Sequence, residues 1–346
     1  MDKIRYFKRG VVIVVLLIFT AITLKSYSIT IDVFNSNNKN EQIWSIGIYE
    51  GEDISELSNK EGILNPILTA SDVTDRTAKF VADPFIKKYN DINYLFFEIL
   101  DSKTNKGVIG LAKSNDLYEW TYDKVVLEEE FHLSYPYVFE YEDEFYMLPE
   151  GGEGGYLSLY KANDFPYGWQ KVSDLLRGNY PDASIFRYND KWWILSTKKD
   201  DNGGYFDNLH LYYSKELLNG WIEHPNSPLL TNDLENSRPA GRILIEDDKI
   251  IRFAQNDKDR YGRAVRAFEI TELSESSYSE KYIGEILTGS GIDGQWNEGG
   301  MHQIDINKEK DNNYMAIVDG DYNKKYNLIL ENYKRKIKSI LNIDNE

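Results

Sequence analysis

Residues 180–195 carry a pattern of apolar and polar positions that predicts two antiparallel β-strands. The segment opens with a Pro-Asp pair, continues through alternating apolar residues, breaks at the polar turn 189–190, and returns as an aromatic run through Trp192 and Trp193. Alternation with a period of two, bounded by turn residues, is typical of a half-buried hairpin. The segment therefore serves as a template for the rest of the chain.

The same phrase of strand, polar turn and apolar strand recurs four more times. The pairs of segments are 83–86 with 94–97, 135–139 with 145–148, 238–241 with 250–253, and 301–304 with 314–317. The equivalent positions Pro84, Pro136, Pro181, Pro239 and His302 are 52, 45, 58 and 63 residues apart. Several short strands in each unit of about fifty residues are typical of the blades of a β-propeller.

Each complete unit continues into two further strands. Segments 107–112, 155–160 and 208–213 are predicted third strands, and Trp120, Trp169 and Trp221 lead into fourth strands and are expected to pack between blades. Segment 44–49 resembles the third strands, whereas the last unit, 301–318, has only the first two. Joining the two ends predicts an all-β, five-bladed β-propeller of four-stranded blades over residues 44–325, closed by an N-terminal strand that leaves no open sheet edge.

The two ends of the chain have different patterns. Residues 1–25 place four basic residues before an apolar run, which predicts a signal peptide or an uncleaved signal anchor. The protein is therefore expected to be exported, and either secreted or membrane-anchored facing the outside, with membrane contact through this segment only. Residues 26–43 are a predicted tether. Residues 326–346 combine helical spacing with basic residues and predict a C-terminal helix or an edge strand.

The composition restricts the classes of ligand that the protein is expected to bind. The formal net charge of -17 argues against nucleic acid, because binding a phosphate backbone needs a basic face, and it favours a neutral or cationic ligand. The absence of Cys excludes disulfides, zinc-thiolate sites and thiol nucleophiles. The 26 Tyr residues suit both pleated sheets and sugar-stacking surfaces. We expect a monomer that binds an oligosaccharide or polysaccharide.

Acidic, basic and hydroxyl side chains lie at the start of the predicted innermost strands. Loops at one end of these strands gather over a central cavity in a propeller, so residues far apart in the sequence are expected to meet there. The openings carry Asp83, Tyr135, Asp182, Ser237, Arg238 and His302, and the loops with Glu150 and Glu298 are within reach. Two or three carboxylates in a tyrosine-rich cavity are the groups that glycoside cleavage requires, one as acid and another as base or nucleophile.

Over residues 44–320 the sequence resembles the five-bladed propellers of family-43 glycoside hydrolases. The resemblance implies that Asp83, in Asp83-Pro84, is the general base, and that Asp182, in the segment 181–186, orients the acid and tunes its pKa. It implies a hub role for His302, in some members over a calcium ion held through waters; no other metal or cofactor is expected. Tyr135, Arg238, His302 and Glu298 are predicted substrate-binding residues, and Glu150 is the predicted substitute acid.

Blade four departs from this pattern. Family 43 places its acid in Glu-Gly-Pro, whereas this chain has Ser237-Arg238-Pro239. The chain is more similar to the propeller at the N-terminus of plant glucosamine inositolphosphorylceramide transferases and to bacterial relatives described only as hydrolase-like. We therefore hold a glycoside hydrolase-like enzyme as the first hypothesis, and a non-catalytic glycan-binding propeller or an accessory protein of glycan or glycolipid assembly as its alternatives.

Each candidate residue also has a plain structural interpretation. Asp83 and Asp182 are suited to accepting backbone hydrogen bonds at strand entries. Glu150 is either an exposed acid or part of a solvated turn. Arg238 is either a clamp for a ligand or the partner that neutralises the two aspartates. His302 contacts substrate or metal, or it is a hydrogen-bonded structural residue.

Overall fold

The computed structural model describes residues 38–60, 62–198, 207–308 and 313–327, together with Thr20, Thr23 and Lys25. The chain divides into two compact units, one of residues 43–322 and one of residues 1–42 with 323–346. Most of the predicted export segment 1–25, tether 26–43 and tail 326–346 lies outside the described residues. Among the helical residues that are described, none forms a helix long and apolar enough to cross a membrane.

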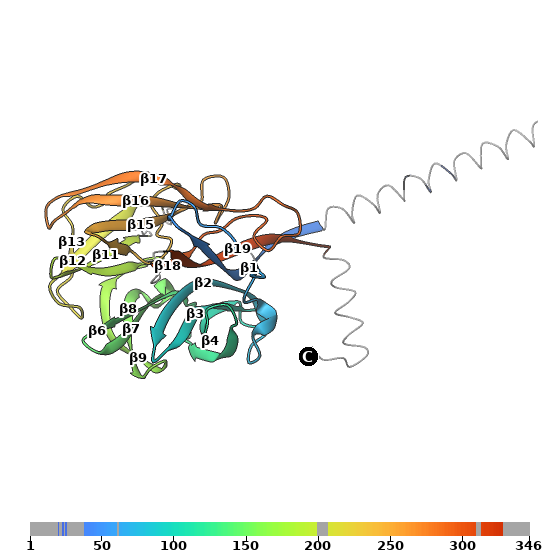
Figure 1. Cartoon of the computed structure of the whole chain (residues 1–346), viewed down its shortest axis with the longest axis horizontal. Helices are drawn as coiled ribbons and strands as arrows, with labels where there is room; N and C mark the ends of the chain where they lie inside the picture. The colour runs from blue at the N-terminus through green and yellow to red at the C-terminus, as the bar shows by residue number, and fades with distance from the viewer. Residues whose placement is uncertain are drawn as a thin grey trace, which may run out of the picture. The chain divides into compact units, whose positions relative to one another are not determined.

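The unit of residues 43–322 contains five antiparallel sheets that follow one another along the chain, as a five-bladed propeller requires (Figure 1). The first four sheets have four strands each, in sequence order. Their strands are β2 (Ala78–Tyr89), β3 (Ile92–Asp101), β4 (Lys106–Ser114) and β5 (Thr121–Leu127); β6 (Ser134–Tyr141), β7 (Glu144–Glu150), β8 (Tyr156–Asp164) and β9 (Tyr167–Arg177); β10 (Ser184–Tyr188), β11 (Lys191–Thr197), β12 (Leu209–Ser214) and β13 (Ile222–Glu223); and β14 (Leu244–Glu246), β15 (Lys249–Asn256), β16 (Ala264–Leu273) and β17 (Tyr278–Thr288).

The fifth sheet closes the ring with strands from both ends of the chain. Its order is β1 (Asn38–Gly51), β19 (Tyr314–Asn327) and β18 (Ile304–Lys308), so the N-terminal strand pairs with the C-terminal ones. Figure 1 shows β1 in blue beside β19 in red. The predicted closure by an N-terminal strand is confirmed. It removes two free strand edges that would otherwise be open to pairing with other chains.

The prediction of four strands in every blade is wrong for this sheet, which has three in the described part of the chain. The segment after β1 touches it only at two isolated bridges, Glu50 with Ser58 and Ile46 with Leu68. Between them Asn65 replaces a ladder partner, since its side chain accepts from Ile48 N at 2.9 Å and donates to Ile48 O at 2.8 Å. A side chain satisfies the edge of β1 there, so no regular fourth strand is needed.

Three tryptophans repeat the same local bond before the outer strands. The indole N–H groups of Trp120, Trp169 and Trp221 donate to backbone carbonyls three or four residues earlier, at 2.7, 2.9 and 3.1 Å. Trp169 is buried, and the other two pack half-buried against the apolar clusters between sheets. Each ring thus fills core volume while its only donor is satisfied, as expected for a tryptophan between blades.

Gly241 comes very close to the inner strand of the next blade. Its φ of 144° lies in the region that favours glycine, and it bridges Ile304 of the next blade in a parallel contact. A Cβ on this residue would lie 1.7 Å from the Ile304 carbonyl oxygen. Only a residue without a side chain allows these two inner strands to come this close.

We predict that Gly241→Ala lowers the free energy of unfolding by about 3 kcal/mol or more, because the new methyl group must displace backbone rather than a flexible side chain. The matched control is Gly284→Ala on β17, where an added Cβ meets nothing within 4 Å; this variant should stay within about 0.5 kcal/mol of the parent. Denaturant unfolding of both variants provides the measurement. Equal stabilities would show that the close contact of the inner strands is not needed.

Candidate functional site

Three of the inner-strand openings share an unusual backbone conformation. Asp83, Tyr135 and Asp182 have φ values of 54°, 47° and 49°, and the pairing of β2 and of β6 with the following strand shifts register there. Non-glycine residues seldom adopt positive φ, and such positions are common at functional sites. Because Asp182 shares this conformation with Asp83, it is the residue of the third repeat that corresponds to Asp83. An alignment that matches Pro181 with Pro84 is therefore offset by one residue in this repeat.

Carboxylate side chains link the inner-strand openings of neighbouring blades by accepting backbone hydrogen bonds. Asp319 accepts a hydrogen bond from the backbone N–H of Asp83, and Asp83 accepts one from that of Tyr135, both at 3.1 Å. Glu150 accepts one from the N–H of Asp182 at 3.4 Å. The structure therefore brings Asp83, Asp182 and Glu150 together at one end of the inner strands. We call these three residues, together with Arg238, His302 and Asp319, the hub cluster.

Arg238 is bound to the acids of blades two and three. Its Nε forms an ion pair with Asp182, and its Nη2 lies 3.9 Å from Glu150 Oε2. Gln255 donates to the same Asp182 oxygen at 2.7 Å. Asp182 is almost fully buried, whereas the side chains of Arg238 and Glu150 keep 13% and 18% of their surface exposed. Solvent therefore reaches the cluster at the Arg238 and Glu150 side.

His302 connects the remaining two acids. Its Nδ1 lies 2.8 Å from Asp319 Oδ1, and its Nε2 lies 3.4 Å from Asp83 Oδ1. The ring packs at 4.0 Å between centroids against Trp44, which comes from β1. The imidazole is therefore fixed between two carboxylates and an aromatic ring, and its place depends on the strand that closes the propeller.

Burial and crowding make the hub cluster hold protons near neutral pH. Burial raises the pKa of Asp83 to about 7, although the charge of His302 opposes the rise. Burial and the nearby Asp182 carboxylate raise the pKa of Glu150 to about 8. Burial disfavours the charged form of His302, but Asp319 and Asp83 outweigh it and raise the pKa to about 9. A neutral carboxylic acid beside an ionised carboxylate can donate a proton to a bound ligand.

Sequence reasoning missed several members of this region. Glu98 is buried near the cluster, and burial together with Asp83 raises its pKa well above the usual value. Asp319 and Gln255 are buried as well. A signal for them exists in the sequence: a polar residue follows the apolar run of the second strand in four repeats, at Glu98, Glu150, Gln255 and Asp319.

Three of the residues discussed from the sequence are occupied elsewhere. Tyr135 is fully buried, and its hydroxyl bonds Ser184 Oγ at 2.9 Å and Gly241 O at 3.1 Å, in a layer beneath the cluster. Ser237 is also fully buried and donates to Asp207 O at 2.8 Å. The Glu298 carboxylate accepts from Gly294 N at 3.1 Å within its own turn. The hydroxyl groups of Tyr135 and Ser237 are thus bonded within the protein, and the substrate-binding roles of Tyr135 and Glu298 stay predictions.

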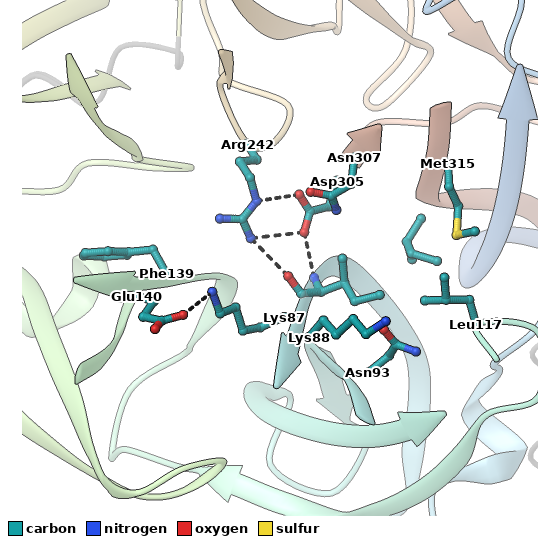
Figure 2. A pocket seen from close by; sticks show the side chains of 12 residues that line it. Lys87, Lys88, Asn93, Leu117, Phe139, Glu140, Arg242, Asp305, Asn307 and Met315 are labelled. Atoms are coloured by element: carbon teal, nitrogen blue, oxygen red, sulfur yellow. Dashed lines mark hydrogen bonds and ion pairs between the residues drawn. The ribbon is translucent and has the colours of Figure 1, made fainter. Parts of the chain in front are cut away.

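Farther along the inner strands an ion pair fills the channel. Arg242 bonds both oxygens of Asp305, at 2.7 and 3.1 Å, and donates to Val138 O at 2.9 Å. Its guanidinium lies over the rings of Tyr137 and Phe85. The pair also lines a pocket of about 400 Å³ (Figure 2). Its described lining contains none of the predicted site residues, so this pocket is separate from the hub cluster.

The predicted calcium position can be compared with the donor atoms present. Asp83, His302 and Asp319 could each offer one ligand atom within 4.8 Å of one another. However, Asp319 already accepts bonds from the N–H groups of Asp83, His302 and Gln303 and faces the His302 ring. Calcium prefers six to eight oxygen ligands. As arranged, the trio fits its own hydrogen bonds better than a calcium ion.

The chain was compared with known proteins. The family model described as "Glucosamine inositolphosphorylceramide transferase 1, N-terminal" matches residues 36–321. Proteins named glucosamine inositolphosphorylceramide transferase 1 are similar in sequence: that of Oryza sativa subsp. japonica is 32% identical over 302 residues, 81% of this chain and 40% of the relative, and that of Arabidopsis thaliana is 31% identical over 300 residues, 82% and 39%. The chain thus spans about 40% of the length of these relatives.

A solved structure shows the same fold. The β-1,2-mannobiose phosphorylase of Listeria innocua, in complex with β-1,2-mannobiose, superposes with a TM-score of 0.57 at 14% identity, over 79% of this chain and 96% of that chain. At this identity the likeness concerns the fold alone. Together with the family match, it confirms the resemblance recognised from the repeated inner-strand phrases.

We predict that the hub cluster makes the protein less stable as the pH rises. The pKa values of Asp83, Glu150 and His302 are all raised, so these three groups bind more protons in the folded protein than in the unfolded chain between about pH 4 and pH 9. Stability is present below this window and is lost as the pH rises through it. Glu150→Gln should reduce the loss between about pH 6 and pH 8 by about 2 kcal/mol.

Denaturant unfolding across that pH range tests the prediction. The matched control is Glu119→Gln, at an exposed position of the first blade, which should leave the slope of stability against pH as it is in the parent. A Glu150→Gln slope identical to that of the control would show that Glu150 does not hold a proton in the folded protein.

Proposed function

The chain belongs to the family of the N-terminal domain of glucosamine inositolphosphorylceramide transferase 1, and from this premise we propose that its hub cluster binds a saccharide in glycan or glycolipid assembly. The observation that supports the proposal most is the arrangement of Asp182, Glu150 and Arg238: two acids and a guanidinium meet at one solvent-reaching end of the inner strands. Carboxylates and guanidinium groups are suited to hydroxyl-rich ligands.

Blade four favours binding over hydrolysis by the usual trio of family 43. In the register of the resemblance, Ser237 occupies the place of the acid, and it is buried with its hydroxyl bonded to a backbone carbonyl. The next residue, Arg238, neutralises Asp182 instead of leaving it to tune an acid. This pairing agrees with the interpretation of Arg238 as the residue that neutralises an aspartate. One edge of the guanidinium lies beside Glu150.

Glycoside hydrolysis is the second candidate, and Glu150 is the observation that favours it. Its raised pKa leaves it protonated near neutral pH, and its side chain is partly exposed. As general acid it would protonate the glycosidic oxygen of the leaving group, while an ionised carboxylate, Asp83, would take a proton from the water that attacks the anomeric carbon. The bond broken is the glycosidic C–O bond, and the products are two free sugars.

The charge of the hub cluster sets the class of sugar. Four acids, Asp83, Glu150, Asp182 and Asp319, face two cationic side chains, Arg238 and His302. Even where Asp83 and Glu150 hold protons, Arg238 and His302 are already paired with Asp182 and Asp319, so a ligand carboxylate or phosphate would meet acids and no unmatched cation of the cluster. A neutral sugar, or an amino sugar with a free ammonium group, is therefore the better ligand.

We predict that the full chain binds neutral or amino sugars and not uronic acids. Isothermal titration calorimetry with glucosamine, N-acetylglucosamine, β-1,2-mannobiose and galacturonic acid gives the comparison. Asp182→Asn should weaken binding at least tenfold, about 1.4 kcal/mol, because Arg238 loses its partner and turns from the ligand. Asp91→Asn, in the exposed β2–β3 turn, is the control. Tightest binding of galacturonic acid, or no binding of any sugar, would contradict the proposal.

The two candidates are separated by Asp83→Asn. If the protein cleaves a glycoside, this change should abolish turnover and leave binding within about tenfold, because only the transition state needs the charge. If the protein only binds, no free reducing sugar appears with the parent either, and the change alters affinity alone. Product analysis of the parent and of Asp83→Asn with the tightest-binding oligosaccharide decides between them.

Export through residues 1–25 remains a prediction. We expect a fusion of residues 1–40 to a reporter that is active only outside the cytoplasm to give reporter activity, because basic residues followed by an apolar run direct secretion. The control replaces two residues of the apolar run by Asp, which should abolish the signal. A reporter that stays inside with the intact segment would exclude an extracytoplasmic role.

A further inference from the structure

Tyr261 lies beside the hub cluster and is a partly exposed residue. The residue is 40% exposed and comes from the loop between β15 and β16. The guanidinium of Arg238 lies 5.3 Å from its ring centroid, and the ring of His302 meets it edge-on at 5.3 Å. Trp44 meets it edge-on at 6.0 Å. An aromatic surface is thus presented next to both the cationic and the acidic groups of the cluster.

The loop that carries Tyr261 is held in one place. Gly262, with a φ of 67°, donates its N–H to Asp257 Oδ1 at 2.7 Å, and a Cβ on it would lie 2.4 Å from the Trp44 ring. On the other side, Arg260 forms an ion pair with the fully buried Asp321. Both neighbours of Tyr261 are therefore anchored, and the ring is positioned before any ligand arrives. A preformed surface binds with a smaller loss of entropy than a mobile one.

A ring in this position has a use that the cluster alone does not supply. A pyranose has a rim of hydroxyl groups and faces formed by C–H groups, so it can place a C–H face on an aromatic ring while its rim reaches polar side chains. The ring and the polar groups are connected through Arg238, since the guanidinium that contacts Tyr261 also pairs with Asp182 and lies 3.9 Å from Glu150.

We propose that Tyr261 is the specificity-determining residue of the hub cluster, and that it selects ligands with a closed pyranose ring whose C–H face packs on its aromatic ring. The inference rests on the proposed saccharide binding and adds to it the class of ligand. Open-chain polyols, which have the same hydroxyl groups but no rigid C–H face, are excluded by this selection. The Tyr261 ring, not its hydroxyl, is the group that acts.

The experiment uses the full chain and pairs each methyl pyranoside with its alditol: methyl glucoside with glucitol, methyl galactoside with galactitol, and methyl mannoside with mannitol. Binding is measured by calorimetry for the parent, Tyr261→Phe, Tyr261→Ala and the control Tyr282→Ala. Tyr282 is 49% exposed on β17 and also contacts an arginine, Arg266, through its ring. Melting temperatures of all four proteins show that each is folded.

We expect the parent to bind at least one pyranoside at least tenfold more tightly than its alditol. Tyr261→Ala should weaken that pyranoside at least tenfold and remove the preference, while Tyr261→Phe and Tyr282→Ala stay within about threefold of the parent. In saturation-transfer NMR, the protons of one C–H face should receive the strongest signal from the parent and lose that contrast with Tyr261→Ala.

The outcomes distinguish this inference from the proposed function. If the parent binds a pyranoside and Tyr261→Ala binds it equally well, the role of Tyr261 is wrong and saccharide binding stands. Equal losses with Phe and Ala would assign the effect to the hydroxyl and overturn the stacking role. A parent that binds no saccharide overturns both.

Discussion

The ion pair between Arg242 and Asp305 is the interaction on which the arrangement of the blades depends. Arg242 enters from the fourth blade, Asp305 belongs to the fifth, and the same guanidinium donates to Val138 O of the second blade. Asp305 also accepts the Ile86 N–H of the first blade at 2.7 Å. Four of the five blades thus meet at one buried pair. Removing one partner of such a pair typically costs about 3–5 kcal/mol, because it leaves the other charge buried and unpaired.

The hub cluster lies toward the other end of the same inner strands and has the opposite character. Around Arg242 the charges are matched and the hydrogen bonds are complete, whereas around Asp83 and Glu150 acids outnumber cations and pKa values rise. A group arranged only for stability would not gather carboxylates that repel one another. Perturbed pKa values and positive φ angles at one place are typical of a site whose local strain serves binding or chemistry. The Arg242–Asp305 layer holds the inner strands that carry this strained end.

Blade four is the part of the propeller that bears most on the proposed function. Replacing a carboxylic acid by Ser237 and Arg238 changes a proton donor into a fixed cation, which binds oxygen-rich ligands but cannot protonate a leaving group. Glu150, one blade away, keeps a protonated acid in reach of the same Asp182. The proposed saccharide binding therefore uses the cation, whereas hydrolysis would require Glu150 as the acid and Asp83 as the base.

The sequence by itself determined the repeat, the number of blades, the closure by β1 and the convergence of Asp83, Asp182, Glu150, Arg238 and His302. These follow from local alternation and from ring geometry, which places every inner-strand opening at the same end. Only the tertiary structure decided which other side chains join these five residues and which pairs are in contact. Asp319 and Glu98 enter from second strands, Tyr135 turns into a buried layer, and Tyr261 reaches the cluster from a loop. The fifth sheet has three strands because a side chain, Asn65, satisfies the edge of β1. Such contacts depend on distances between blades far apart in the chain. A polar residue that follows the apolar run of the second strand in four repeats marks Glu98 and Asp319 as candidates, but a pattern of neighbouring residues does not say which side chains they meet.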